Sequence, residues 1–77
     1  MTIAEANFPV PENIERIIAK KGLKKNFIAE QSNLSPGSLS DILNGRRSIR
    51  PCEIILISRA MMVEPNELFA DINEVSS

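Results

Sequence analysis

Histidine is absent from the 77-residue sequence, and cysteine occurs once, as Cys52. An intramolecular disulfide is therefore excluded, and a zinc site has almost no ligands to draw on. Without histidine, and with serines and carboxylates scattered along the chain, no nucleophile and base pair is visible. These absences argue against an enzyme and a metalloprotein, and no cofactor is expected.

Long apolar runs are also missing. The strongest candidate, IILIS at residues 54–58, belongs to a helix with charges on both sides, so neither a signal peptide nor a membrane span is expected. No internal repeat, low-complexity tract or long linker is present. A chain of this length holds one small core and leaves no room for a separate sensor or catalytic domain. The sequence predicts a cytoplasmic protein with no membrane contact and no small-molecule ligand.

Charge is unevenly distributed along the chain. The net charge is −1, yet residues 16–50 hold eight basic residues against two acidic ones, a balance of +6. Residues 1–15 carry −3 and residues 51–77 carry −4. A basic block on an otherwise acidic protein predicts a face that binds a polyanion.

Two short helical patterns lie inside the basic block, at residues 25–31 and 36–43. The four residues between them are too few for antiparallel packing, so the pair is typical of a helix-turn-helix. Asn33 tolerates the left-handed conformation that ends the first helix. Ser35 is a suitable cap for the second helix, in which Pro36 takes the first position. Asn44-Gly45 then provides a stop.

Apolar periodicity predicts three further helices around this pair. One runs from about Pro11 to Gly22, a second from about Pro51 to Met62, and a short one starts at Pro65. For residues 1–10 three readings remain open, a disordered leader, an arm or an extended segment. The acidic tail, residues 71–77, is expected to fray, although Ile72 and Val75 could continue an apolar stripe into a partner. The side chains predicted to face the core are Ile14, Ile17, Ile18, Ile28, Ala29, Leu39, Ile42, Leu43, Ile54, Ile57, Ser58, Met61, Leu68 and Phe69.

Three segments, LKKNFIAE, NLSPGSLSDILNGRR and PCEIILISRAMMVEPNELF, carry a family resemblance. From Gly22 to Phe69 the chain resembles the phage-repressor-like helix-turn-helix family, also called lambda-repressor-like or Cro/XRE. The resemblance implies an all-α, compact bundle of about five short helices, with the DNA-binding domain at 11–70, a leader at 1–10 and a tail at 71–77. It also implies a sequence-specific regulator of transcription, a repressor or Cro-like protein, that binds double-stranded DNA as a homodimer.

The resemblance assigns roles to both helices of the motif. The second would enter the major groove with Pro36, Gly37, Ser40 and Asp41 toward the bases. None of these is a long bidentate reader such as Arg, Gln or Asn, although Asp41 could accept from a cytosine amino group. The residues expected to contact phosphate are Lys24, Lys25, Ser38, Arg46, Arg47 and Arg50.

A second function class remains open because long readers are missing from that helix. The chain could be a protein-interaction module, antitoxin-like or a co-regulatory subunit, that keeps the fold and has lost groove reading. Gly37 and Asp41 would then be ordinary solvent-facing residues, and the lysines and arginines a solvated surface. Ile55 and Leu56, apolar residues on other faces of their helix, could supply a subunit interface.

Overall fold

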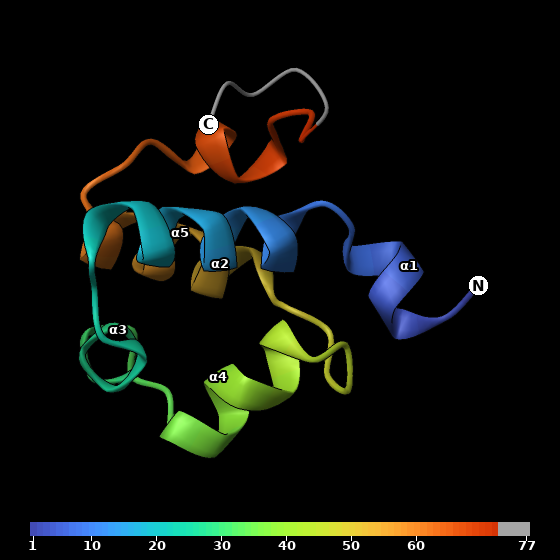
Figure 1. Cartoon of the computed structure of the whole chain (residues 1–77). Coiled ribbons are helices and arrows are strands. Elements are labelled where there is room, and N and C mark those ends of the chain that lie inside the picture. Colours follow the sequence, from blue (N-terminus) through green and yellow to red (C-terminus); the bar gives the residue numbers. More distant parts are fainter. Residues whose placement is uncertain (73–77) are drawn as a thin grey trace.

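The computed structural model describes residues 1–72 and folds them into helices joined by short loops (Figure 1). No strand occurs in this range, so the predicted all-α bundle is confirmed. The elements are α1 (Ile3–Asn7), α2 (Val10–Lys21), α3 (Lys25–Gln31), α4 (Pro36–Leu43), α5 (Pro51–Met61) and the 3-10 helix η1 (Pro65–Phe69).

The core draws on every helix except α1. In the packing, η1 lies against α2 and α5, while α3 lies against α4 and α5. Burying each large aliphatic side chain contributes about 1.5–3 kcal/mol relative to leaving it exposed. The largest buried hydrophobic side chains are Ile14, Ile28, Leu39, Ile42, Ile57, Met61 and Leu68, all of them predicted to face inward.

Local chemistry fixes the turn between α3 and α4 as predicted. Asn33 has a φ of 58°, and the N–H of Leu34 donates to the carbonyl of Ala29 at 2.8 Å, which satisfies a carbonyl at the end of α3. Ser35 caps α4 by accepting from the N–H of Ser38 at 3.0 Å. The predicted bounds of both helices are thereby confirmed.

The leader is neither disordered nor extended over its whole length, because residues 3–7 form the helix α1. Its start is a capping box in which Thr2 Oγ1 accepts from the N–H of Glu5 at 3.1 Å. In return, the N–H of Thr2 donates to Glu5 Oε1 at 3.0 Å, and the backbone hydrogen bond lowers the pKa of Glu5. A helix this short with no buried residue gives no hydrophobic periodicity, so the sequence pattern missed it.

The prediction that Phe69 seals the core together with Leu68 is wrong for Phe69, which is 55 % exposed. A 3-10 helix has three residues per turn, so neighbouring side chains point about 120° apart and only one of the two can face the core. Leu43 and Ile54 are only partly buried, at the edge of the core. Val75, which was predicted to continue an apolar stripe together with Ile72, lies outside the described residues.

Asn13 on α2 is fully buried, and its side-chain amide holds the end of η1. Its Nδ2 donates to the carbonyls of Leu68 at 2.8 Å and Ala70 at 2.9 Å. Arg16 Nε donates to Asn13 Oδ1 at 3.4 Å, so both ends of the amide have partners. Among residues 1–72, no helix has both the length and the apolarity that crossing a membrane requires.

Candidate nucleic-acid interface

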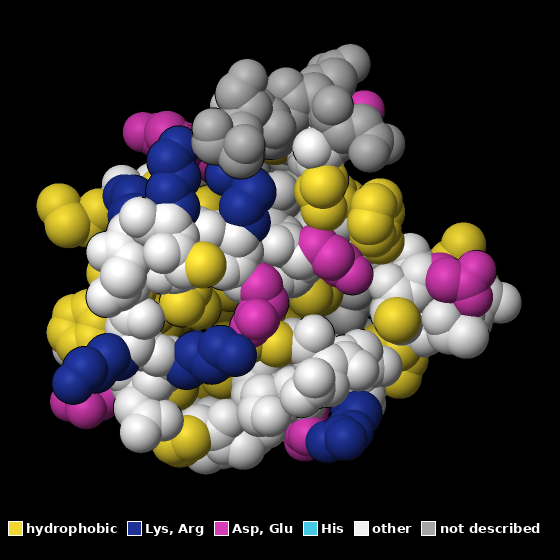
Figure 2. Space-filling view, in the orientation of Figure 1, with side chains coloured by type: hydrophobic (Ala, Val, Ile, Leu, Met, Phe, Trp, Pro, Cys, Tyr) yellow, Lys and Arg dark blue, Asp and Glu magenta, His cyan; other side chains and the backbone are white. Residues whose placement is uncertain are grey.

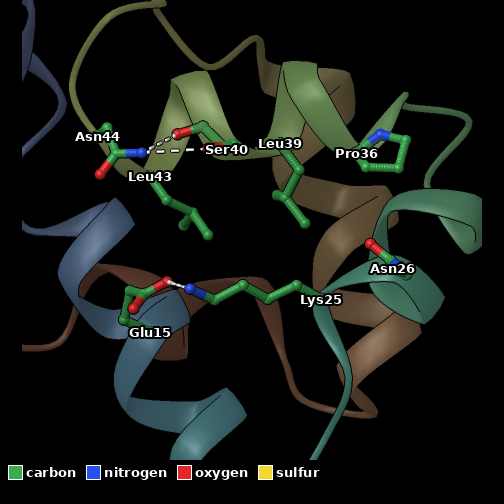
Figure 3. Close-up of a pocket in the computed structure, with 8 residues that line it drawn as sticks. All are labelled: Glu15, Lys25, Asn26, Pro36, Leu39, Ser40, Leu43 and Asn44. Atoms are coloured by element: carbon green, nitrogen blue, oxygen red, sulfur yellow. Dashed lines mark hydrogen bonds and ion pairs between the residues drawn. The ribbon is translucent and has the colours of Figure 1, made fainter.

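The side chains predicted to face the bases are accessible along α4, although Pro36 and Ser40 also line a cleft toward α2 and α3. Pro36, Gly37 and Ser40 are exposed, and Asp41 is about half exposed. The last turn of the helix is braced, because Asn44 Nδ2 donates to the carbonyl of Ser40 at 2.9 Å and to its hydroxyl at 3.2 Å (Figure 3). The side chains at positions 36, 37, 40 and 41 are short, and only Asp41 is charged, so a flat surface could approach the backbone of α4 closely.

A cleft lies between α4 on one side and α2 and α3 on the other, and an ion pair joins α2 to α3 at its edge (Figure 3). Lys25 Nζ lies 2.9 Å from Glu15 Oε1, and both side chains are about half exposed. Exposed pairs of this kind contribute about 0–1 kcal/mol, so Lys25 can leave Glu15 at little cost. Lys24 beside it is exposed and forms no ion pair within residues 1–72.

Beyond α4, two arginines of the following loop are exposed. Arg46 is 72 % exposed, and its Nη1 lies 3.8 Å from Asp41 Oδ1, which is too long for a hydrogen bond. Arg50 is exposed and has no ion pair in the described part of the chain. Both guanidinium groups are therefore available to an anion from outside the molecule.

Arg47, also predicted to contact phosphate, has partners within the molecule. Its Nη1 and Nη2 donate to Glu53 Oε1 and Oε2 at 2.9 and 2.7 Å, and Nη1 also donates to the carbonyl of Ser48 at 3.2 Å. The arginine side chain is 28 % exposed, and that of Glu53 only 7 %. The guanidinium lowers the pKa of Glu53, and the carboxylate raises that of Arg47. The loop arginine that the charge count grouped with its neighbours is thus held by α5.

Glu53 is a structural residue that the sequence reasoning did not identify. It also accepts from the N–H of Arg50 at 2.9 Å, which caps the first turn of α5. The signal was present in the sequence, since a carboxylate three residues into a helix commonly caps its start. Its link to Arg47, six residues earlier, depends on the path of the loop and has no local signature.

Ser38 is partly buried near the start of α4. Its N–H donates to Ser35 Oγ and its hydroxyl accepts from the Ser35 hydroxyl, both at 3.0 Å. The hydroxyl hydrogen of Ser38 is left to donate elsewhere. Its predicted role at a phosphate therefore remains sterically and chemically open.

The surface around α4 alternates in charge. Figure 2 shows the lower band of that face, over α4, as mostly uncharged, with Lys or Arg side chains toward both ends and acidic side chains close to them. Two ion pairs contribute to this alternation, one between Lys25 and Glu15 and one between Arg46 and Asp41. The basic block of the sequence is therefore divided in the fold. Lys24 and Lys25 lie at the start of α3, and Arg46, Arg47 and Arg50 lie in the loop after α4, so two flanks border α4 and neither is uniformly positive. The other basic residues of the block, Arg16, Lys20 and Lys21, lie on α2.

Comparison with known proteins adds a family and a structural neighbour. Residues 14–68 match the family HTH_3, described as helix-turn-helix. No curated protein matches the chain. The fold is similar to the crystal structure of the restriction-modification controller protein C.AhdI from Aeromonas hydrophila, with a TM-score of 0.73 and 25 % sequence identity. That alignment covers 78 % of this chain and 91 % of the other.

Proposed function

We propose that this chain recognises a specific DNA duplex with α4 in the major groove. The chain belongs to the helix-turn-helix family HTH_3 and is a DNA-binding regulator of transcription rather than an enzyme. The observation that carries the proposal is the exposed, slim outer side of α4 between two flanks of exposed cations. A repressor or Cro-like mode, in which the bound protein blocks access to the DNA, is part of the proposal.

Base reading would depend on close approach rather than on long side chains. Pro36 and Gly37 at the start of α4 leave space for the helix backbone to enter the groove, and Ser40 can donate or accept at several base edges. Asp41 can accept from a cytosine amino group, provided that Arg46 offsets its repulsion of phosphate. Discrimination at each position should then be modest, and the groove shape would contribute to the choice of site.

Phosphate anchoring falls to the exposed cations of the two flanks. Lys24 and Lys25 serve one flank and Arg46 and Arg50 the other, with Ser38 as a neutral donor between them. Arg47 is left out because Glu53 occupies its guanidinium. Four cationic contacts give a slope of log K against log salt of about −4. The measured slope therefore indicates how many cationic side chains contact phosphate.

A homodimer on a palindromic site is the arrangement that we propose, because one eight-residue helix reads only a few base pairs. Ile55 on α5 is 45 % exposed despite being a large aliphatic residue, which makes it a candidate for the subunit contact. Sedimentation of Ile55→Asp tests this point: a lower molecular weight than the wild type is expected, and an unchanged one dismisses Ile55 from the interface. The site of action would be the cytoplasm, where a regulator of this kind meets its DNA.

Selection of bound sequences from random duplex DNA tests the function itself. Enrichment of a palindrome is expected, and its half-site spacing gives the dimer geometry. If no sequence is enriched, the alternative of a protein-interaction module replaces sequence-specific regulation.

A matched pair of variants then identifies the reading helix. Gly37→Glu places a negative charge at the groove-facing start of α4, where the nearest atom to a new Cβ is Ser35 Oγ at 3.9 Å, so the fold should be spared. Affinity for the selected duplex should fall by at least about 100-fold. Asn66→Glu adds the same charge at an exposed position of η1, which lies on the other side of α2 from α4 (Figure 1), and should change affinity little. Equal affinities for the two variants would remove α4 from the reading role.

A further inference from the structure

The short helix α1 lies against the turn that ends α4 and contacts it at two points (Figure 1). Ala4 covers Gly45 so closely that a Cβ built on Gly45 would lie 2.8 Å from Ala4 Cβ and 3.3 Å from Ala4 Cα. Further along the loop, Asn7 Nδ2 donates to the carbonyl of Arg47 at 3.2 Å. A helix outside the matched residues 14–68 thus touches the loop that carries one cationic flank.

This contact is not a by-product of core packing. No residue of α1 is buried, and the helix begins with its own capping box at Thr2 and Glu5. Gly45 meets two demands at once, since its φ of 74° favours glycine and the approach of Ala4 leaves no room for a side chain. The glycine at position 45 therefore leaves space for Ala4 at one of the two points where α1 meets the loop.

The same loop is fastened on its other side by α5. The guanidinium of Arg47 is held by Glu53, while the carbonyl of Arg47 is held by Asn7. One residue is thus fixed through its side chain and through its backbone, by two helices that are far apart in the sequence. Its neighbour Arg46 and the nearby Arg50 project from a loop whose course is set before any ligand arrives.

We propose that α1 is a positioning element for DNA binding, which pre-organises the loop of residues 44–50 so that Arg46 and Arg50 meet phosphates without a further ordering cost. The proposal rests on the DNA-binding function proposed above and assigns positioning roles to Asn7, Ala4 and Gly45. Ordering a rotamer-rich side chain or loop on binding weakens affinity, and fixing it beforehand removes that penalty. The expected gain is about threefold to tenfold in affinity for one or two such side chains.

The test uses the full chain and the selected duplex. Asn7→Ala removes the hydrogen bond to the loop and changes no charge, so affinity should fall about threefold to tenfold while the salt slope stays that of the wild type. A lost phosphate contact would instead lower the slope by about one. Binding is measured where unfolding curves show every variant to be folded, so that a purely structural role leaves affinity unchanged.

Gly45→Asn and its rescue locate the effect at the helix contact. Asparagine tolerates a left-handed backbone, but its Cβ would meet Ala4, so α1 should be displaced and affinity should fall. Adding Ala4→Gly to that variant removes the nearest atom and should restore most of the affinity. The matched control is Gly22→Asn, where φ is 67° and nothing lies within 4 Å of a new Cβ; its affinity should equal that of the wild type.

The outcomes separate this inference from the function on which it rests. If the wild type enriches no duplex, the proposed function fails. If the wild type binds its duplex and both Asn7→Ala and Gly45→Asn bind equally well, α1 has no positioning role. A loss in Gly45→Asn that Ala4→Gly does not relieve also overturns the inference, because the effect would then belong to residue 45 alone.

Discussion

Two ion pairs beside α4 differ in how firmly they hold their cation. On the α3 side, Lys25 pairs with Glu15 at the edge of a cleft, and both side chains are about half exposed. On the loop side, Arg47 makes a two-pronged contact with a carboxylate that is almost entirely buried. An exposed pair exchanges its partner for a phosphate at small cost, whereas the partner of a buried pair would be left unsatisfied. Adjacent basic residues in one sequence block can therefore have a binding role or a structural role.

The largest expected effect is on folding, at Arg47. Arg47→Ala leaves the Glu53 carboxylate buried with only the N–H of Arg50 as a partner, which should lower the free energy of unfolding by about 2–3 kcal/mol. Arg46→Ala, one residue away and mostly exposed, should change it by less than about 0.5 kcal/mol. Urea denaturation of the two variants measures the difference, and similar values would erase the distinction between the two arginines.

The next largest effect is on DNA binding, which should depend on Arg46 rather than on Arg47. Arg46→Ala should weaken binding to all duplexes alike, by about 1 kcal/mol, and reduce the salt slope by about one. Arg47→Ala, measured where it is folded, should keep the wild-type slope. Titrations at several salt concentrations provide the slopes. A reduced slope for Arg47→Ala would return that residue to the set of phosphate contacts.

The ion pair between Arg47 and Glu53 should make the stability of the protein depend on pH in the acidic range. The pKa of Glu53 is lowered from its ordinary value of 4.5, chiefly by hydrogen bonding to Arg47, so its contribution is complete above about pH 4.5 and is lost as the pH falls through the depressed folded value. The difference in unfolding free energy between wild type and Glu53→Gln should be large at pH 7 and shrink below pH 4.5. Glu5, whose pKa is also lowered, is present in both proteins and cancels. A difference that is constant with pH would contradict this account.

The smallest effect is expected at the exposed pair. Glu15→Gln should change the free energy of unfolding by less than about 0.5 kcal/mol, because solvent already screens both partners. Removing the carboxylate frees Lys25 and should raise duplex affinity slightly. Thermal unfolding and binding of this variant, beside Glu53→Gln, compare the two ion pairs directly. A large loss of stability in Glu15→Gln would show that both pairs are structural.

Local signals in the sequence were enough to predict the helix-turn-helix. Ser35 and Pro36 favour the start of a helix, while Asn33 and Gly45 tolerate the left-handed backbone that follows the end of one. The core followed from apolar spacing, which reports burial whenever a helix is long enough to show a period. The roles proposed for individual residues at the DNA remain predictions.

The features that the sequence did not reveal depend on contacts between distant residues. Counting charge assigned Arg47 by its sign, while its role depends on where the loop brings Glu53. The packing of α1 on Gly45 joins residues about forty positions apart. It could not be predicted, because a glycine at the end of a helix needs no other explanation. Asn13 was passed over for the same reason, because nothing near it in the sequence indicates that its amide meets η1.

The hydrogen bonds of Asn13 also identify a suitable position for a spectroscopic label. By donating to the carbonyls of residues 68 and 70, its amide holds η1 on α2, across the molecule from the helix proposed to read DNA (Figure 1). The exposed ring position at Phe69 is thus a site for a dye, introduced as Phe69→Cys in a chain whose own thiol is replaced by Cys52→Ser. Such a label would report tumbling of the complex while leaving the nucleic-acid side of the protein unobstructed.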